Sequence, residues 1–366
     1  MWTDDGIFVE DMAQVCSTQW IPWKRLEGKT LLITGATGLI GFTLVSALLY
    51  ANCKRKLNMT LLALVRDEER AKARFAGQGT DCLHWIAGDM MNIPAIEQPI
   101  DYIIHGASQT RSKAFVQEPV ETIKTAFTGT CAMLELAREK RVSGFVYLSS
   151  MEVYGYPPKG HKVTERDASC LSAMDVRGSY PIGKLQCENL CCAYASEYGV
   201  PAMIARLTQA FGPGVNYDDT RVFAEFARCA KEKRDIVLKT KGETERSYLY
   251  TADAATALLT ILLKGQPGQA YNVADESTHC SIAEMAHGLA DANGIGVRFN
   301  LESEDRNAYL SVLYMDLDTA LLRSLGWSPT ACGAGAPGKE KLATMYRNMM
   351  EYMNPPPFER RESRNK

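Results

Sequence analysis

Short apolar runs alternate with longer stretches of helical periodicity between residues 30 and 206. The runs are rich in aliphatic and β-branched residues, which is typical of strands buried in a parallel sheet. They occupy residues 30–34, 60–65, 84–87, 101–105, 144–149 and 202–206. Between them, apolar positions recur every three or four residues, most clearly over 120–138. This alternation predicts an α/β fold built on a doubly wound parallel sheet.

Beyond residue 206 the alternation stops. A loop around Gly212, Pro213 and Gly214 is followed by an expected helix at about 221–233, and 271–273 returns once to the sheet. The remainder reads as a smaller mixed domain. The expected parts are a leader over 1–27, a main domain over 28–208 with a return near 245–273, a second domain over 209–244 and 274–350, and a tail over 351–366. The leader, with Trp2, Trp20 and Trp23, is expected to pack on the main domain or on a neighbouring subunit.

Composition excludes several classes of protein. The chain of 366 residues is 46% hydrophobic, enough for a large core, and its net charge of −2 argues against a nucleic-acid surface. Eleven cysteines without a C-x-x-C pair, together with five scattered histidines, predict no metal site and a reducing, cytoplasmic location. The start of the chain does not resemble a signal peptide, and no apolar run is long enough to span a bilayer, so we expect no membrane partner.

Three glycines follow the first predicted strand at a spacing of three. Gly35, Gly38 and Gly41 lie between that strand and an apolar helix that includes 42–50. In a strand–loop–helix unit such glycines allow a tight turn, close approach of the backbone to a pyrophosphate, and close packing of helix and strand. The N-terminus of the helix then offers free N–H groups to phosphate. This loop predicts a dinucleotide site.

The end of the second strand bears on the choice of dinucleotide. Arg66 and Asp67 stand side by side there. An acidic residue at this strand end hydrogen-bonds the ribose of NAD, whereas an arginine suits the extra phosphate of NADP. Arg66 is either an adenine-stacking group or an exposed charge, and Asp67 is a candidate ribose ligand. NAD is expected, and NADP remains open.

A tyrosine–lysine pair supplies candidate acid–base chemistry. Tyr180 and Lys184 are four residues apart, so a helix would project both from one face. A protonated Lys184 would favour the Tyr180 phenolate, because a nearby positive charge lowers the pKa of an acid. Tyr180 then becomes a plausible base for a sugar hydroxyl. Ser150, just past a strand end, can donate to and accept from the same substrate oxygen.

Taken together, these motifs resemble the extended short-chain dehydrogenase/reductases, the NAD-dependent epimerase/dehydratase family of nucleotide-sugar enzymes. The resemblance extends from Lys29 to about Pro329. It rests on residues 34–41, 88–89, 105–108, 149–155, 180–184, 212–214, 246–250 with Asp253, and 325–327. It implies a Rossmann sheet with a smaller C-terminal substrate domain, a nucleotide-sugar substrate, and a homodimer.

The resemblance also implies roles for individual residues. The implied catalytic residues are Ser150, Glu152, Tyr180 and Lys184. Ser150, Gln209, Arg221 and Arg246 would bind substrate, with the two arginines on its diphosphate, since their planar guanidinium groups suit phosphate oxygens. The implied cofactor residues are Gly35, Thr37, Gly38, Leu39, Ile40, Arg66, Asp67, Asp89, Met90, Ala107, Ser108, Tyr180 and Lys184.

In such enzymes a hydride passes from the sugar to NAD, which creates a transient ketone, and in many members it then returns. The family's 4,6-dehydratases carry an aspartic acid where this chain has Met151, and a thioether cannot protonate a leaving hydroxyl. UDP-glucuronate decarboxylases keep the following glutamate, here Glu152, and a D-x-R-V segment like residues 219–222. Two features depart from the decarboxylase pattern: Met151 is bulky, and Thr208-Gln209 replaces phenylalanine-asparagine.

Four interpretations follow from this comparison. The first is a UDP-glucuronate decarboxylase-like enzyme, and the second is a nucleotide-sugar or nucleotide-polyol epimerase, although simple C4 epimerases generally lack a glutamate like Glu152. The third is an NDP-glucose 4,6-dehydratase. The fourth is a non-catalytic NAD(P)-sensing relative, against which the intact set of Ser150, Tyr180 and Lys184 argues.

Overall fold

A computed structural model describes residues 6–109, 114–301 and 312–354 of the chain. Its centre is a seven-stranded sheet in the order β11-β7-β5-β4-β1-β2-β3, in which every neighbouring pair of strands is parallel. The strands are β1 (Thr30–Thr34), β2 (Thr60–Val65), β3 (Leu83–Ala87), β4 (Tyr102–His105), β5 (Gly144–Ser150), β7 (Ala202–Leu207) and β11 (Ala270–Val273). The predicted doubly wound parallel sheet is confirmed.

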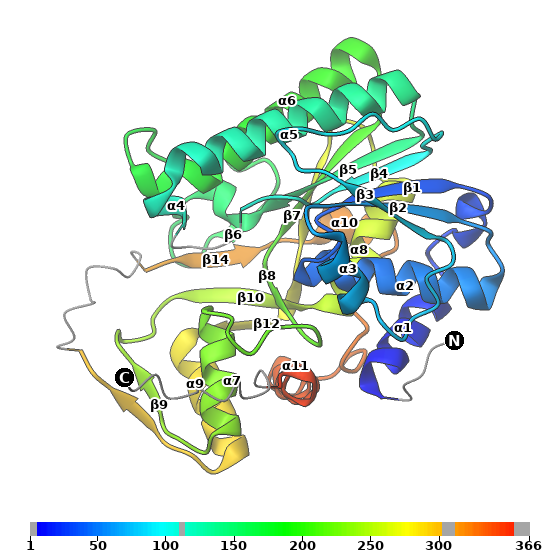
Figure 1. Ribbon diagram of the computed structural model, residues 1–366. Helices are drawn as coiled ribbons and strands as arrows, with labels where there is room; N and C mark the ends of the chain where they lie inside the picture. The colour runs from blue at the N-terminus through cyan, green and yellow to red at the C-terminus, as the bar shows by residue number, and fades with distance from the viewer. Residues whose placement is uncertain (1–5, 110–113, 302–311, 355–366) are drawn as a thin grey trace, which may run out of the picture.

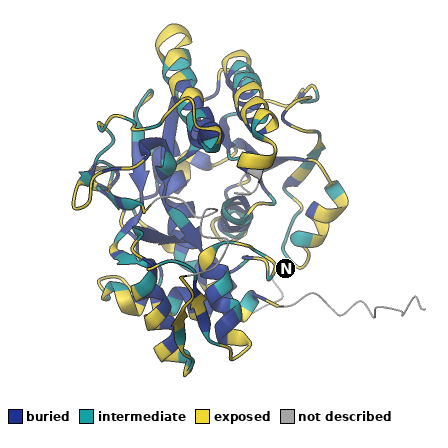
Figure 2. Cartoon of the chain, turned by 90° about the vertical axis from the view of Figure 1, so that its left-hand side faces the viewer, coloured by how far each residue is buried: buried dark blue, intermediate teal, exposed yellow. Residues whose placement is uncertain are grey.

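Helices cover both faces of this sheet (Figure 1). α5 (Pro119–Lys140) and α6 (Ser179–Tyr198) pack together on one face, and α2 (Leu39–Arg55) and α8 (Thr251–Lys264) pack on the other. Successive side chains of a strand point to opposite faces. Leu31 and Ile33 therefore join the core beneath α2 and α8, whereas Leu32 joins the core beneath α5 and α6. Burial on both faces explains why the strands read as unbroken apolar runs, and Figure 2 shows them dark blue in the interior.

The N-terminal leader folds onto the main domain. It forms α1 (Ile7–Ser17), which packs on α2 and α8, and a short 3₁₀ helix, η1 (Trp23–Leu26). The ring of Phe8 stacks on that of Phe42 with centroids 5.2 Å apart, and Trp23 is buried with its indole N–H donating to the Thr18 carbonyl at 3.1 Å. Trp2 and most of the tail lie outside the described residues.

A second sheet has five strands, in which β12-β10-β14-β6 lie in order and β8 pairs with β10. Its strands are β6 (Lys162–Val163), β8 (Gln209–Phe211), β10 (Glu245–Tyr250), β12 (Asp275–Ser281) and β14 (Tyr314–Leu317). A separate pair is formed by β9 (Ile236–Leu238) and β13 (Val297–Phe299). The helices α7 (Val222–Lys231), α9 (Ile282–Asn293) and α11 (Gly338–Tyr352) pack together beside the second sheet, whereas α10 (Ala320–Ser324) packs on β11 of the main sheet. Only α8 and β11 of the expected return at 245–273 rejoin the main sheet; β10 belongs to the second sheet.

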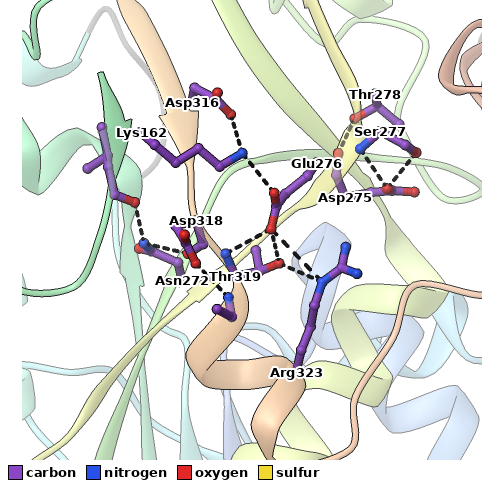
Figure 3. A network of polar contacts seen from close by, with 12 residues as sticks. Lys162, Asn272, Asp275, Glu276, Ser277, Thr278, Asp316, Asp318, Thr319 and Arg323 are labelled. Carbon is purple, nitrogen blue, oxygen red and sulfur yellow. Dashed lines mark hydrogen bonds and ion pairs between the residues drawn. The ribbon is translucent and has the colours of Figure 1, made fainter. Parts of the chain in front are cut away.

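A polar network joins the two sheets (Figure 3). The Lys162 ammonium lies 2.7 Å from Glu276 and 2.9 Å from Asp316, so three segments of the second sheet share one cluster of charges. Asn272, fully buried at the end of β11, donates to the carbonyls of Val163 and Asp318 at 3.0 Å. This amide therefore fixes the edge of the main sheet to the second sheet.

Candidate active site

The glycine loop after β1 forms a surface open to a ligand. A Cβ on Gly35 would lie 2.8 Å from the carbonyl carbon of Gly106, and Gly35 has a φ of +74°. A Cβ on Gly41 would lie 2.1 Å from the Gly35 oxygen, so both positions require glycine. Gly38 is different: it is exposed, and a Cβ there would meet only the Gly35 oxygen, at 3.2 Å.

The first turn of α2 is equally open. Gly38 occupies its N-cap and offers no side chain to the N–H groups of that turn. These free donors and the positive end of the helix dipole suit a pyrophosphate. Thr37, Leu39 and Ile40 are half-buried around the loop. The loop therefore fits the dinucleotide that the sequence predicts.

Buried hydrogen bonds hold the neighbouring loop after β4 in place. The Thr34 hydroxyl lies 2.7 Å from Nδ1 of His105 and accepts the N–H of Ala107 at 3.1 Å. Burial lowers the pKa of His105 to about 3, so its ring is neutral and its role is structural: it hydrogen-bonds the hydroxyls of Thr34 and Thr130. Ala107 and Ser108 are half-buried where this loop passes close to Gly35.

The acidic residues after β2 and β3 are oriented by backbone amides. Asp67 is exposed and accepts the Arg70 N–H at 2.9 Å, which caps α3 (Glu68–Arg74). Asp89 is also exposed, and one of its oxygens accepts two amides from the turn that follows, at 2.8 and 2.9 Å. Arg66 is exposed, whereas Met90 is buried beneath α5, close to Gly129.

Ser150, Tyr180 and Lys184 meet where β5 ends and α6 begins. Ser150 is the last residue of β5, and its hydroxyl hydrogen-bonds Tyr180. Tyr180 and Lys184 lie in the first turns of α6, and the Lys184 nitrogen is 5.8 Å from the centre of the Tyr180 ring. The three residues therefore come together as their spacing suggested.

The expected effect of Lys184 on Tyr180 is not seen. Burial raises the pKa of Tyr180, the negative charge of Glu152 raises it further, and the Ser150 hydrogen bond only partly opposes them. The Lys184 ammonium instead donates to the Leu148 carbonyl at 2.7 Å, and burial lowers its own pKa to about 8. In the protein without cofactor, burial and Glu152 therefore favour the protonated phenol of Tyr180, and Lys184 is not among the groups that lower its pKa.

Glu152 lies in a 3₁₀ turn, η2 (Met151–Tyr154), directly after Ser150. An oxygen of its carboxylate is 3.6 Å from a terminal nitrogen of Arg177. Burial raises the pKa of Glu152, and Arg177 and then Arg246 oppose that rise. The turn itself is fastened because the Tyr154 hydroxyl donates to the Asn272 amide oxygen at 2.7 Å.

Two residues of this site were missed from sequence. Arg177 stacks on the ring of Phe115, 5.0 Å from its centroid, and Phe115 in turn stacks on Tyr180 at 4.3 Å with the rings 6° from parallel. Phe115 belongs to the short helix α4 (Ala114–Gln117), far from Tyr180 in sequence. The sequence near Tyr180 offered one clue to these two residues: Arg177 stands three positions before Tyr180, so it had to lie close to the start of the same helix.

Two more arginines face the same region. Arg246 donates to the Gln209 side chain at a long 3.4 Å, and its buried Nε has no hydrogen-bond partner among the described residues. Arg221 is the N-cap of α7 and is held by Asp219, with Nε–Oδ1 at 3.0 Å. The positive charge of Arg221 also lowers the pKa of Tyr180, against the larger effect of burial. The site is thus rich in guanidinium groups, whose planar shape suits phosphate oxygens.

The position after Ser150 is buried and apolar. Met151 is 4% exposed and packs in a cluster with residues of β6 and β14. The Thr208 hydroxyl lies 3.3 Å from its sulfur and donates to the Ser247 carbonyl at 2.6 Å. No proton donor therefore replaces an aspartic acid at position 151.

A sequence profile of the NAD-dependent epimerase/dehydratase family matches residues 31–274. The chain belongs to this family. It is therefore a member of an enzyme family whose epimerases and dehydratases use NAD. Among the described residues no cluster of three metal-ligating side chains occurs, and no helix there combines the length and apolar character needed to cross a bilayer.

Curated relatives of this family member include decarboxylases. UDP-glucuronic acid decarboxylase 1 of Xenopus tropicalis is 29% identical over 306 residues, which cover 81% of this chain and 68% of that protein. UDP-glucuronic acid decarboxylase 6 of Arabidopsis thaliana is 31% identical over 65% of this chain and 67% of its own length. A trifunctional UDP-glucose 4,6-dehydratase of Arabidopsis thaliana is 26% identical, matching 82% of this chain and 44% of that protein.

Solved structures share the fold. A UDP-glucuronic acid 4-epimerase of Bacillus cereus, in complex with UDP-glucuronic acid and NAD, superimposes with a TM-score of 0.70 at 19% identity over 88% of this chain and 98% of that one. An epimerase of Methanothermobacter thermautotrophicus gives a TM-score of 0.73 at 20% identity, covering 94% and 97% of the two chains.

Proposed function

We propose that this chain binds NAD and a nucleotide sugar, and that it decarboxylates UDP-glucuronate through a transient 4-keto sugar. The decarboxylase relatives support this choice within the family. The observation that carries it is the pair of residues after Ser150: Met151 is buried and cannot donate a proton, whereas Glu152 reaches the site.

The glycine loop would hold the cofactor. The backbone at Gly35 and Gly38 would approach the pyrophosphate, and the free N–H groups of the first turn of α2 would bind it. Asp67 or Asp89 would contact the adenosine. When bound, NAD supplies reversible hydride transfer with a carbon of the sugar.

The chain's own residues would move the protons. The Tyr180 hydroxyl would exchange a proton with the sugar hydroxyl that becomes the ketone, and Ser150, which hydrogen-bonds Tyr180, would hold the same oxygen. Arg246 and Arg221 would bind the diphosphate; the unpartnered Nε of Arg246 supports this role.

The residues after Ser150 favour decarboxylation over dehydration. Loss of a C6 hydroxyl requires a proton donor beside it, and Met151 supplies only a thioether. Loss of CO₂ from a 4-keto-glucuronate needs no such acid, because the ketone takes up the developing negative charge. Glu152, held close to Arg177, would orient the sugar or handle the proton at the adjacent carbon.

The test is to incubate the protein and NAD separately with UDP-glucuronate, UDP-glucose and dTDP-glucose, and to weigh the products by mass spectrometry. We expect a UDP-pentose and CO₂ from UDP-glucuronate and no dehydrated product from either glucose. A product of unchanged mass would indicate an epimerase instead, and a product lighter by one water would overturn the argument from Met151.

The same reactions test cofactor recycling. If the hydride returns to the sugar in each cycle, absorbance of reduced nicotinamide should not accumulate as product forms. Reduced cofactor growing in step with product would point to a net dehydrogenase and contradict both the decarboxylase and the epimerase.

We further propose that the enzyme acts in the cytoplasm as a homodimer. All eleven cysteines are free thiols, which suits a reducing compartment. An exposed apolar stripe on α5, formed by Val120, Ile123 and Phe127, offers a surface for a second copy.

A further inference from the structure

Arg177 is connected to both side chains that we propose to handle protons. It contacts Glu152 directly, and it is linked to Tyr180 through the ring of Phe115. It lies in a 3₁₀ turn, η3 (Val176–Gly178), immediately before α6. Its guanidinium is 3.6 Å from the Glu152 carboxylate and 5.0 Å from the centroid of Phe115, whose ring lies parallel to that of Tyr180. Cation, phenyl ring and phenol thus form one stack beside the carboxylate.

Local hydrogen bonds hold two members of the stack, Arg177 and Phe115. The Arg177 N–H donates to the Asp175 side chain at 2.9 Å, which fixes the turn. The buried Ser179 hydroxyl donates to the Phe115 carbonyl at 2.8 Å, which ties α4 to the start of α6. The side chains of Arg177 and Glu152 are only 20% and 32% exposed, so water screens their contact less than it would at the surface.

We infer that Arg177 is a positioning residue: its guanidinium orients the Glu152 carboxylate and, through Phe115, the Tyr180 ring, so that the two groups are held as one unit. The inference rests on the proposed function only for the part that Glu152 plays in turnover. An arginine suits this position because its planar group can stack on an aromatic face while it binds a carboxylate.

The contact also sets the charge of Glu152. The titratable and charged groups that act on Glu152 are Arg177 from η3 and Arg246 from β10, while Tyr180 faces it from α6. Burial favours the neutral carboxyl, and the two arginines favour the carboxylate. Removal of the Arg177 charge should therefore raise the pKa of Glu152.

The direct test is to titrate Glu152 by carbon NMR in protein labelled at the glutamate side-chain carboxyl, with Glu152→Gln identifying the signal. In Arg177→Met the titration should move to higher pH, and Arg177→Lys should restore part of the shift. Arg298→Met is the matched control, because Arg298 on β13 forms an ion pair with Asp235, the residue before β9, away from the site. It should leave the Glu152 titration unchanged.

Turnover supplies a second readout. In Arg177→Met, kcat should fall about tenfold to a hundredfold, the scale expected when catalytic groups are misplaced, and its acidic limb should move to higher pH. KM should change little, and Arg177→Lys should recover part of kcat. If Arg177→Met does not fold, as judged by circular dichroism, the titration of Glu152 in Arg177→Lys tests the inference instead. Lysine lacks the planar group that stacks on Phe115, so the Glu152 titration should still differ from that of the parent.

Two results would overturn the inference. One is a Glu152 titration that is the same in the parent and in every folded Arg177 variant. The other is a rise in KM for the sugar acid with kcat and its pH profile unmoved, which would make Arg177 a substrate ligand. Failure of the proposed function looks different: the parent would form no pentose from UDP-glucuronate, while the NMR titration would still test the contact.

Discussion

The hydroxyl of Tyr180 is the single group on which the proposed chemistry depends most. It lies at the junction of Ser150, Glu152 and the stacked ring of Phe115. Tyr180→Phe removes this oxygen and keeps the ring, so the stack should survive. Because general acid–base catalysis contributes about a hundredfold or more, we expect kcat to fall by at least that factor with KM little changed.

Steady-state kinetics with UDP-glucuronate measures this effect. Tyr198→Phe is the control, since Tyr198 is half exposed at the far end of the same helix and should leave kcat unchanged. Near-normal turnover in Tyr180→Phe would show that the sugar proton is transferred by another group.

At this scale the sequence predicted which side chains would meet but not how they would affect one another. Helical spacing and a strand end were enough to bring Ser150, Tyr180 and Lys184 together. The pKa of Tyr180 depends on the balance of burial against charge, which spacing does not contain. The contact with Phe115 arises only when two distant segments fold together.

At the scale of elements, the strands of the main sheet were predictable because burial on both faces makes each an unbroken apolar run. The second sheet was not. Its strand β6 has only two residues, and β14 pairs with β6 and β10 from distant parts of the chain. The helix α1 was also missed, because its packing on α2 and α8 is evident only once the fold is known.

The junction of β1 and α2 carries the first prediction at this scale. Gly38→Val should leave the protein folded, because a Cβ there meets only one backbone oxygen at 3.2 Å. The added side chain should occupy the space that the pyrophosphate needs, so NAD binding measured by calorimetry should be lost. Gly288→Val, at an exposed helical position with nothing within 4 Å of a Cβ, is the control and should bind NAD normally. Undiminished NAD binding by a folded Gly38→Val protein would show that this loop does not hold the cofactor.

The contact between α1 and β10 gives the second prediction at this scale. Asp11 is buried, accepts a hydrogen bond from the Tyr250 hydroxyl at 2.7 Å, and has a pKa raised to about 7, mainly by burial. Its ordinary value is 3.8, so the folded state holds the proton more tightly than the unfolded chain does. Stability should therefore be lost as pH rises from about 4 through about 7.

Asp11→Asn removes that dependence, because the amide stays neutral and can still accept from Tyr250. The variant should unfold at a higher temperature than the parent at pH 8, and the advantage should vanish near pH 4. Each tenfold change in proton affinity is worth about 1.4 kcal/mol, so the gain in the free energy of unfolding should be of the order of a few kcal/mol. Asp291→Asn, at an exposed position on α9, should show no such pH-dependent difference. An equal effect of Asp11→Asn at both pH values would mean that Asp11 is already ionised in the fold at low pH.

At the scale of the whole molecule, the face formed by α5 is unusual for its apolar exposure. Val120, Ile123 and Phe127 are 59%, 39% and 42% exposed, and their spacing puts them on one stripe of the helix. Charged residues normally cover such a face, and an uncovered stripe indicates a binding surface. In a twofold dimer one patch pairs with its own copy, so a single helix face can supply both halves of the interface.

We therefore expect the parent to be a dimer in solution and Ile123→Asp to be a monomer, because a charge at the centre of the stripe would be buried against its own copy in the dimer. Light scattering coupled to size-exclusion chromatography measures both masses. Phe299→Asp introduces the same charge at an exposed apolar position of β13, in the second domain, and should remain dimeric. Since the stripe lies on the opposite face of the main sheet from α2, the Ile123→Asp monomer should still bind NAD. A parent of monomeric mass, or a variant that keeps the dimeric mass, would exclude this face as the interface.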